Sequence, residues 1–368
     1  MLSAIVLLNN ELDVKYAAKP LLDCNVLEMA AHNMHEAGIE KVCVVNKELV
    51  SEYRGVEICS TLYDAISLVG WEEDGDLVIL DGLYPNLKTK TYKELFEMGT
   101  SMVEGRHILK LKLSELKDIN ELEFELYDID AEELEKIENN RDLADYTRHI
   151  NKEIVKKHID NGVYFVDRKC VYIGPFVKIA EGVKIYPDVV LEGDTVIGKG
   201  TSITNGSHLV NAKVGEECKI ISSRISDSSI GNKVSVGPCS HLRMNCEVGD
   251  AVRIGNYVEF KNTKFGYKSR CAHLSYVGDS VVGEDVNIGC GVVTVNYDGA
   301  HKHKTEIGDH AFVGSNANLI APIKVGAYAM VAAGSTVNHD VFDGDMGIAR
   351  CRQETKQGFG FKYINKEK

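Results

Sequence analysis

The strongest constraint on this chain is an aliphatic residue at every sixth position, maintained through three long runs. A helix needs apolar spacing near 3.6 and a half-buried strand a spacing of two, so neither explains a sustained six. The pattern predicts a hexapeptide β-helix, in which each hexad is one short strand plus a turn and three hexads make a coil. A β-sandwich is the alternative, but its strands recur at roughly 8- to 12-residue spacing and less regularly. The repeating positions are Ile173, Ile179, Ile185, Leu191, Ile197, Ile203 and Leu209, then Ile230, Val236, Leu242, Val248, Ile254 and Phe260, then Ile307, Val313, Leu319, Val325, Val331 and Val337.

The charge is divided unevenly along the chain. Residues 1–138 carry a net charge of −16 and the remainder +3. An acidic amino-terminal part does not attract nucleic acid or free polyphosphate, whereas a mildly basic solenoid can accept anionic ligands. The ten cysteines include no C-x-x-C pair, which favours reduced thiols in a cytoplasmic protein over a zinc or redox site. We expect neither a signal peptide nor a membrane anchor, because no apolar run approaches about 18 residues and no cleavage site follows the first segment.

Four segments are expected. The first is predicted to be a small α/β domain with a parallel sheet, because apolar runs alternate with a helical pattern at Val26–Gly38. The second is predicted to be one amphipathic helix, with Leu143, Tyr146, Ile150 and Ile154 on its apolar face. The β-helix and a polar, basic tail follow. The expected bounds are 1–138, 139–162, 163–345 and 346–368, and the strand-like runs of the first segment are Ala4–Leu8, Lys41–Val45 and Leu77–Leu80.

Chemistry is expected where the hexad rhythm breaks. Val295–Thr305 is too polar for the core and is predicted to project from the prism. Arg243 and Lys261 are 18 residues apart, which is one predicted coil, so their charges should stack about 5 Å apart and favour a bridging anion. Taken alone, His273 is more readily interpreted as a structural histidine than as a catalytic base. The Lys and His residues of the loop are equally compatible with solvated surface.

At these residues the sequence resembles a known family. Leu242-Arg243, Ile254 to Lys261, His273 to Tyr276, Asn287-Ile288-Gly289 and Asn296 to Gly299 occur in the order and spacing found in the acetyltransferase domain of the bacterial bifunctional N-acetylglucosamine-1-phosphate uridyltransferase/glucosamine-1-phosphate acetyltransferase. The resemblance extends from about Asn139 to Gly358. It implies a nucleotidyltransferase-like α/β domain, a long connecting helix and a left-handed parallel β-helix. It also implies a homotrimer in which neighbouring prisms build each site together.

The resemblance assigns roles residue by residue. His273 matches the general base that takes a proton from the amine of the sugar. Cys290 stands where the family usually has Ala, which changes the packing beside acetyl-CoA although a backbone contact could survive. Acetyl-CoA is the implied co-substrate, and neither a metal site nor Mg²⁺ is expected for the acetyl transfer. The positions matching the amino-sugar phosphate site are Arg243, Lys261, Tyr276, Asn287 and Lys302, and those matching the acetyl-CoA site are Cys290, Asn296, Tyr297, Ser315, Ala333 and Arg350.

The amino-terminal segment departs from the family. Where the family has a Gly-rich phosphate loop, this chain has Asn9–Asp13, with no glycine and two carboxylates. Leu83 occupies the position of the family's metal-binding aspartate when the following prolines are aligned, and Asp81 lies two residues early. The segment is also shorter than the family's domain. We therefore predict that uridyltransferase activity is lost and that the segment has a structural or regulatory role or uses another substrate.

Two functional classes stay open at this point. The first is an enzyme that transfers acetyl from acetyl-CoA to glucosamine-1-phosphate, or to another amino sugar, for UDP-N-acetylglucosamine and cell-wall precursor synthesis. The second is a non-catalytic trimeric scaffold that binds a sugar nucleotide or a protein. Retention of His273, Arg243 and Lys261 together favours the enzyme. No nucleic-acid or membrane partner is expected, and the predicted location is the cytoplasm.

Overall fold

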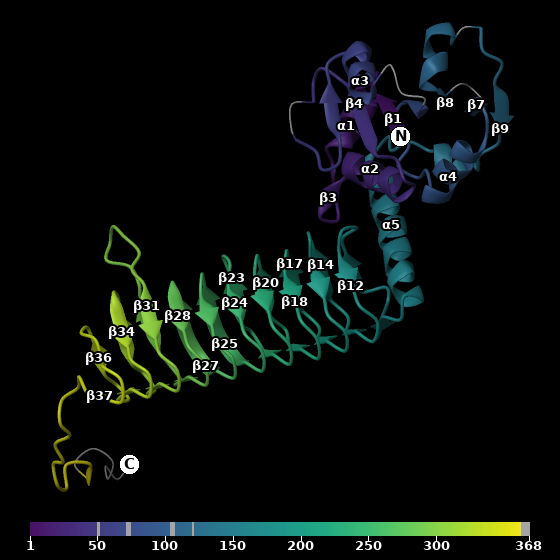
Figure 1. Cartoon of the computed structure of the whole chain (residues 1–368). Helices are drawn as coiled ribbons and strands as arrows, with labels where there is room; N and C mark the ends of the chain where they lie inside the picture. Colours follow the sequence, from purple (N-terminus) through teal and green to yellow (C-terminus); the bar gives the residue numbers. More distant parts are fainter. Residues whose placement is uncertain (50–51, 71–74, 104–106, 120, 362–368) are drawn as a thin grey trace. The chain divides into compact units, whose positions relative to one another are not determined.

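The computed structural model describes residues 1–49, 52–70, 75–103, 107–119 and 121–361. The chain divides into two compact units. One consists of Met1–Asp160, Tyr172–Val177 and Leu191–Gly193, and the other of Asn161–Val171, Lys178–Val190 and Asp194–Lys368. Figure 1 shows helices and a sheet in the first unit and a stack of short strands in the second.

The first unit contains a seven-stranded sheet of order β5-β4-β1-β6-β8-β7-β9. Its first four strands are parallel, as predicted, but β8 is antiparallel to both β6 and β7. The three strands predicted from the sequence, β1, β4 and β6, are thus parallel, and the sheet continues past β6 with an antiparallel pair that was not predicted. The strands are β1 (Leu2–Leu7), β4 (Lys41–Val45), β5 (Glu57–Cys59), β6 (Asp76–Asp81), β7 (Ser101–Val103), β8 (Ile108–Lys112) and β9 (Glu125–Tyr127), with the separate hairpin β2 (Pro20–Leu21) and β3 (Cys24–Asn25).

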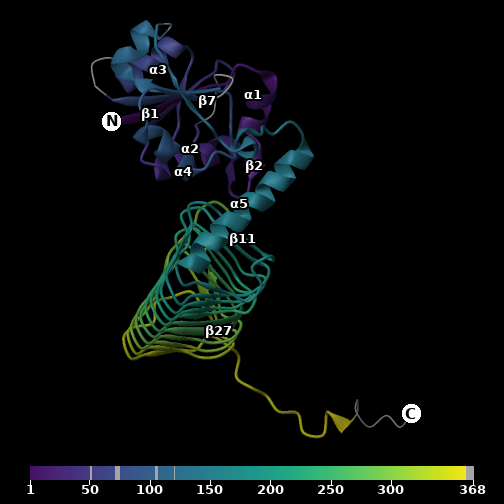
Figure 2. The same cartoon turned by 90° about the vertical axis from the view of Figure 1, so that its right-hand side faces the viewer.

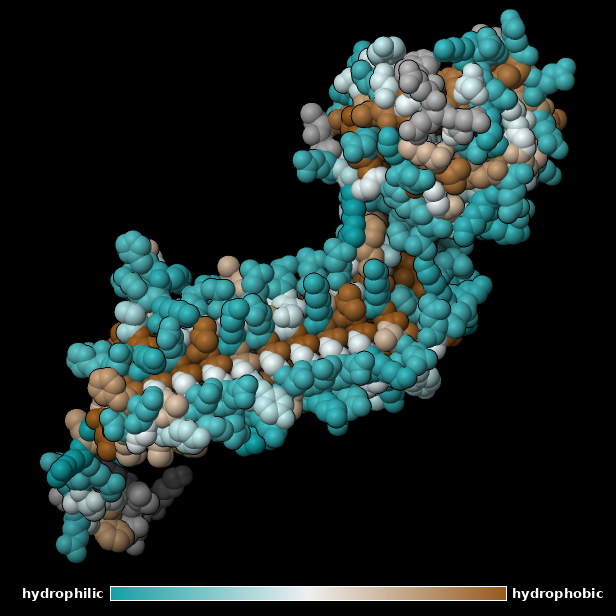
Figure 3. Space-filling model, in the orientation of Figure 1, coloured by the Kyte–Doolittle hydropathy of each residue, from teal (hydrophilic) through white to brown (hydrophobic). Residues whose placement is uncertain are grey.

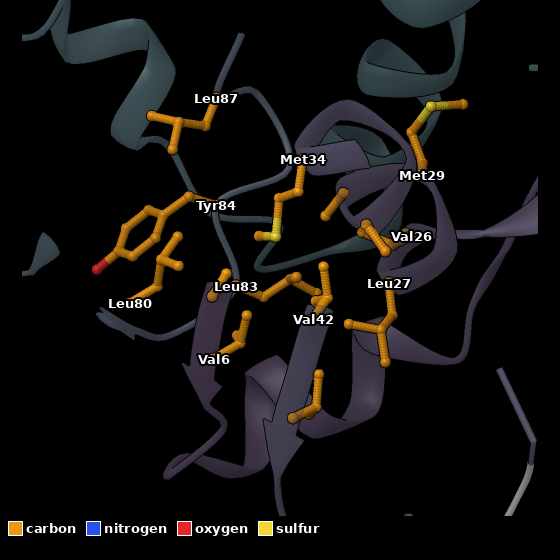
Figure 4. Close-up of a cluster of buried hydrophobic side chains, with 14 of the residues drawn as sticks. Val6, Val26, Leu27, Met29, Met34, Val42, Leu80, Leu83, Tyr84 and Leu87 are labelled. Carbon is orange, nitrogen blue, oxygen red and sulfur yellow. The ribbon is translucent and has the colours of Figure 1, made fainter. Parts of the chain in front are cut away.

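Helices cover this sheet and close its core. The predicted helix after the first strand forms as α2 (Val26–Glu36), where Asn25 and Glu28 make a reciprocal capping box. It ends two residues early, and Gly38 follows at a φ of 99°. Figure 4 shows Leu83 packed with Val6 and Val42 in the buried cluster. The other helices are α1 (Glu11–Ala17), α3 (Leu62–Val69), α4 (Thr89–Glu97), η2 (Leu113–Asp118) and η3 (Ala131–Leu134).

The predicted amphipathic helix is α5 (Asn140–Asp160). Tyr146 and Ile150 are buried in the core of the first unit, and Leu143 and Ile154 pack against it. The Tyr146 hydroxyl donates to the Pro85 carbonyl at 2.7 Å. The apolar face identified from the sequence is therefore the face that packs. No described helix is both long enough and apolar enough to cross a membrane.

The second unit is built on a parallel β-helix, whose stacked coils are visible nearly end-on in Figure 2. One face is a nine-stranded parallel sheet, β12-β15-β18-β21-β24-β26-β28-β31-β34. Its strands are β12 (Lys178–Ile179), β15 (Val196–Ile197), β18 (Lys213–Val214), β21 (Ser229–Ile230), β24 (Glu247–Val248), β26 (Lys264–Phe265), β28 (Ser280–Val282), β31 (Thr305–Ile307) and β34 (Ile323–Val325).

The remaining two faces join into one 19-stranded sheet. They join because β25 and β27 are each nine residues long and continue around a corner between the faces. The strands are β10 (Tyr164–Phe165), β11 (Val171–Ile173), β13 (Lys184–Ile185), β14 (Val189–Glu192), β16 (Ser202–Ile203), β17 (His208–Val210), β19 (Lys219–Ile220), β20 (Arg224–Ser226), β22 (Ser235–Val236), β23 (His241–Arg243), β25 (Arg253–Lys261), β27 (Arg270–Gly278), β29 (Asn287–Ile288), β30 (Val293–Val295), β32 (Phe312–Val313), β33 (Asn318–Ile320), β35 (Met330–Val331), β36 (Thr336–Val337) and β37 (Met346–Gly347).

The hexad residues fill the interior, as predicted. Every residue of the three aliphatic runs is buried, and most have an exposed fraction of 0 or 1%. The space-filling view shows hydrophilic residues on either side of a narrow apolar band along the stack (Figure 3). Since buried apolar area supplies most of the free energy of folding, the aliphatic column accounts for the stability of an architecture with strands of only two or three residues.

Candidate active site

His273 faces solvent at the corner around which β25 and β27 both continue. Asn256 is the register partner of His273 on the preceding coil, and its Oδ1 lies 2.8 Å from Nδ1 of the imidazole. A carboxamide oxygen can only accept, so Nδ1 is the donor and Nε2 carries the free lone pair. The adjacent Gly255 has no room for a side chain, because a Cβ there would lie 1.7 Å from the Ala272 carbonyl oxygen. The corner therefore holds a solvent-facing imidazole in one tautomer.

Cys290, Ser315 and Ala333 continue the same edge of the prism. The strand register pairs Ile288 with Val313 and Val313 with Val331, so the residues two positions later also lie on successive coils. The amide of Asn316 donates to the Cys290 carbonyl at 2.7 Å, and that of Gly334 donates to the Ser315 carbonyl at 2.8 Å. Cys290 and Ser315 are exposed, as are Ala333 and Arg350. The structure thus places four of the predicted cofactor residues at one end of the prism, on the coils that follow His273.

Arg243 and Lys261 are direct register partners on β23 and β25, as predicted. Each also has a carboxylate partner that the sequence reasoning did not find. The Arg243 guanidinium lies 2.7 Å from Glu259, and Lys261 Nζ lies 3.1 Å from Asp279. Because each cation has its own carboxylate partner, the stacking of the two charges does not by itself indicate a bridging anion. The pair still presents charge-assisted donors to any phosphate that binds beside it.

Asp279 connects Lys261 to the rest of the site. Its carboxylate also accepts from Asn262 at 2.8 Å and from the amide of Asn296. The same amide lies 3.3 Å from the Tyr276 hydroxyl. Burial alone would raise the pKa of Asp279, but the hydrogen bonds from Asn262 and Lys261 and the charge of Lys261 hold it below its usual value. Asn296 itself is only 5% exposed, so its side chain belongs to this internal network.

The polar loop between β30 and β31 projects from the stack, as predicted (Figure 1). Asp298 shapes it by accepting from the amides of Ala300 and His301 and from Nε2 of His303, at 2.6 to 2.7 Å. These bonds hold the pKa of Asp298 well below its usual range, with the His301 amide contributing most.

The loop also brings two predicted site residues together. An isolated antiparallel bridge pairs Tyr297 with Lys302. Lys302 Nζ lies 4.2 Å from the centre of the Tyr297 ring, within cation–π range. Both side chains are thus presented on one exposed loop.

His273 and the predicted phosphate-binding residue Lys261 remain apart within one chain. His273 lies five residues before Gly278, the register partner of Lys261 on β27. At roughly 3.3 Å per residue, His273 and Gly278 are separated by up to about 16 Å along β27, and the bend of the strand at the corner shortens this distance. Asn287 lies on β29, in register with Arg270 on β27 and with Phe312 on β32.

In the first unit, Asn9–Asp13 is the segment expected to lack a phosphate-binding loop, and it contains the start of α1. The Asn10 side chain caps α1 by accepting from the Asp13 amide at 2.7 Å, which occupies an amide that a phosphate would need. The Asp13 carboxylate pairs with Lys136 at 3.0 Å. Asp81 accepts from the Asn9 amide at 3.2 Å, while Leu83 is buried in the core.

The first unit also contains a cavity of about 1090 Å³, whose lining residues lie in the sequence from Tyr84 to His149. Six Asp or Glu residues and two lysines line it. Lys88 pairs with Glu133 at 3.0 Å, and Lys136 is already paired with Asp13. An acidic lining with its lysines engaged repels polyphosphate. Among the described residues, no group of three or more His, Cys, Asp or Glu has the arrangement of a metal site.

Three residues beside the predicted site were missed: Asn256, Glu259 and Asp279. All three contact a predicted residue on an adjacent coil, at sequence separations of 16 to 18. Because that separation is one coil, pairing each candidate with the residues about 17 positions away would have identified them.

The stacked hexads and the polar corner define a hexapeptide-repeat β-helix protein. Residues 304–339 match the family model described as bacterial transferase hexapeptide (six repeats).

The chain is similar to proteins described as bifunctional protein GlmU. That of Listeria monocytogenes serotype 4b (strain CLIP80459) is 41% identical over 287 residues, which cover 76% of this chain and 63% of the relative. Those of Geobacillus sp. (strain WCH70) and Caldicellulosiruptor saccharolyticus are 44% and 46% identical over 59% and 58% of this chain. The resemblance inferred from the sequence motifs is thereby confirmed. The chain spans less than two thirds of the length of these curated relatives.

Among solved structures, a UDP-N-acetylglucosamine acyltransferase from Francisella novicida is 18% identical, with a TM-score of 0.33. The match covers 51% of this chain and 66% of that one. A likeness of this degree carries no functional information.

Proposed function

We propose that the β-helix transfers acetyl from acetyl-CoA to the amine of glucosamine-1-phosphate, as the similarity to bifunctional GlmU proteins suggests. The observation that carries the proposal is the hydrogen bond between Asn256 Oδ1 and His273 Nδ1 at 2.8 Å. It leaves Nε2 of an exposed imidazole as a free base at the start of the strip formed by Cys290, Ser315 and Ala333. A base beside a cofactor strip is what amine acylation requires.

His273 Nε2 accepts a proton from the amine of the sugar as the nitrogen attacks the thioester carbonyl. The C–N bond forms, and negative charge develops on the carbonyl oxygen, which hydrogen-bond donors in the assembled site would stabilise. Collapse of this intermediate breaks the C–S bond, and the proton held by His273 returns to the departing thiolate. The products are the acetamide of the sugar phosphate and the free thiol of CoA.

Arg243 and Lys261 would hold the phosphate of the sugar, with Tyr276, Asn287 and Lys302 completing the acceptor site. The carboxylates of Glu259 and Asp279 keep the two cations oriented before the substrate arrives. Acetyl-CoA would contact Tyr297, Asn296 and the strip from Cys290 to Arg350. Because the side chain of Asn296 is buried, Asn296 can contact acetyl-CoA only through its backbone, or after its side chain has left Asp279.

We further propose a homotrimer in which adjacent prisms complete each site. The amine and the phosphate of glucosamine-1-phosphate are on adjacent ring carbons, so a neighbour that supplies one of the two groups accounts for the distance between His273 and Lys261 on one chain. An exposed apolar ladder also supports assembly. Phe312, Met330 and Met346 are register partners on successive strands, with exposed fractions of 44, 43 and 53%. Such a ladder is typical of a protein interface.

The proposed organisation assigns residues 1–138 to a degenerate nucleotidyltransferase-like domain, 139–162 to a linker helix, 163–345 to the catalytic β-helix and 346–368 to a tail. The capped start of α1 and the burial of Leu83 support the loss of uridyltransferase activity. We propose a cytoplasmic enzyme of UDP-N-acetylglucosamine synthesis with no metal in its acetyl transfer.

A thiol-release assay with acetyl-CoA tests this function. Glucosamine-1-phosphate, glucosamine-6-phosphate and glucosamine are offered in parallel. Release that depends on glucosamine-1-phosphate supports the proposal, and preference for another amino sugar would replace the acceptor. Absence of release with every amino sugar, from a protein that is trimeric and folded, would favour the non-catalytic scaffold.

A further inference from the structure

A cationic group lies one coil away from the proposed phosphate position. Arg224 on β20 is the register partner of His241 on β23, and His241 is the partner of Glu259 on β25. His241 and Arg243 are two residues apart on one strand, so their side chains share a face of the sheet. Arg224, His241 and Arg243 therefore lie on one surface, with successive coils about 4.8 Å apart.

Arg224 differs from its neighbours in its partner. Arg243 and Lys261 are each paired with a carboxylate, whereas the Arg224 guanidinium contacts Nδ1 of His208 at 3.1 Å. Within the described part of the chain, Arg224 has no carboxylate within ion-pair distance. Since a guanidinium has five donors and this contact uses one, the exposed Arg224 side chain has further donors to offer an anion.

His241 lies between the two guanidiniums. Burial lowers its pKa most, and the charges of Arg243 and Arg224 lower it further against the opposing effect of Glu259. A neutral imidazole offers one N–H donor to an anion without adding charge repulsion between the arginines. The surface therefore combines an arginine without a carboxylate, a neutral donor and the adjacent Arg243.

We propose that Arg224 and His241 form a second anion-binding position beside Arg243 and Lys261, and that it takes the second phosphate of an amino sugar carried on a nucleoside diphosphate. The inference rests on the proposed function for the first phosphate position. A diphosphate bound across adjacent coils places its sugar-proximal phosphate on Arg243 and Lys261 and its distal phosphate on Arg224. The acceptor class of the site then includes diphosphate-linked amino sugars as well as the monophosphate.

The test compares inorganic pyrophosphate with orthophosphate by titration calorimetry on the full chain. The parent protein is expected to bind pyrophosphate at least about tenfold more tightly. Arg224→Ala should weaken pyrophosphate about tenfold and orthophosphate less than about twofold, and His241→Ala should weaken pyrophosphate about threefold. Lys213→Ala is the matched control, since it removes an exposed cation from the opposite sheet and should change neither affinity. Equal affinities for the two anions, or an equal loss of both in Arg224→Ala, would overturn the second position.

The same variants are then titrated with UDP-glucosamine and glucosamine-1-phosphate. UDP-glucosamine should bind more tightly than glucosamine-1-phosphate. Arg224→Ala should remove this difference in affinity. Weaker binding of UDP-glucosamine than of the monophosphate would overturn the diphosphate acceptor. These titrations need no turnover, so an absence of acetyl transfer would reject the proposed function without deciding this inference.

Discussion

Replacement of Asn256 tests whether the protein prepares His273 for its proposed role as the base. Asn256 Oδ1 accepts from Nδ1 at 2.8 Å, and this bond strengthens when Nε2 takes the proton of the amine and the ring becomes a cation. A neutral hydrogen bond contributes about 1 kcal/mol net and a charged one about 2 kcal/mol, so roughly 1 kcal/mol is specific to the transition state. Asn256→Ala should therefore lower kcat about fivefold while leaving the KM of both substrates within about twofold.

A second substitution separates positioning from general damage. Asn256→Asp keeps the acceptor and adds a negative charge that favours the protonated ring, so the acidic limb of the kcat/KM profile should move up by at most about one pH unit. At high pH this variant should recover most of the rate that Asn256→Ala loses. Asn205→Ala, an exposed asparagine at another turn of the β-helix, is the control and should match the parent.

The measurements are pH–rate profiles of thiol release, with the oligomeric state and the circular dichroism spectrum checked for each variant. Unchanged kcat in Asn256→Ala, or identical profiles for the Ala and Asp variants, would refute the role assigned to Asn256.

Three further outcomes are expected. Arg243→Ala and Lys261→Ala should each raise the KM for the phosphorylated sugar about tenfold or more, through loss of a charge-assisted contact, and a rise in the KM for acetyl-CoA instead would reverse the two pockets. Asp279→Asn should lower the free energy of unfolding at pH 7 by about 2 kcal/mol in urea, since the Lys261–Asp279 pair is only 13% exposed at each side chain. Because the folded pKa of Asp279 lies below its ordinary value, the stability it provides is present above about pH 4 and is lost as the pH falls through the folded value, so the parent and the variant should converge in acid. The chain should release no pyrophosphate from UTP, Mg²⁺ and N-acetylglucosamine-1-phosphate, and turnover comparable to acetyl transfer would show that the first unit holds an intact nucleotide site.

The repeat made the β-helix predictable because one residue in six has to fill the interior whatever the neighbouring residues are. The same regularity placed Arg243 opposite Lys261, since no loop or shortened turn interrupts the coil between them. Several other coils contain 16 or 17 residues, as between His208 and Arg224 and between Arg224 and His241, so contacts such as Asn256 with His273 require the observed register. In the first unit, the local pattern predicted both ends of β4, Lys41 and Val45, correctly.

The first unit was harder to predict because its chemistry depends on pairing between distant segments. The direction of β8 is set by its neighbours in the sheet, and no local pattern specifies it. The sequence showed that Asn9–Asp13 lacks glycine, but it did not show that Asn10 starts a helix there or that Lys136 neutralises Asp13. Both contacts strengthen the prediction that no triphosphate binds at this segment.

The most direct test of the central claim measures acetyl transfer to glucosamine-1-phosphate by the parent protein and by His273→Ala, with the acetylated sugar phosphate identified by its mass. The parent is expected to form this product, and His273→Ala, folded and in the same oligomeric state as the parent, is expected to form it about 10²- to 10⁴-fold more slowly. Comparable rates for the two proteins would contradict the assignment of His273 as the general base.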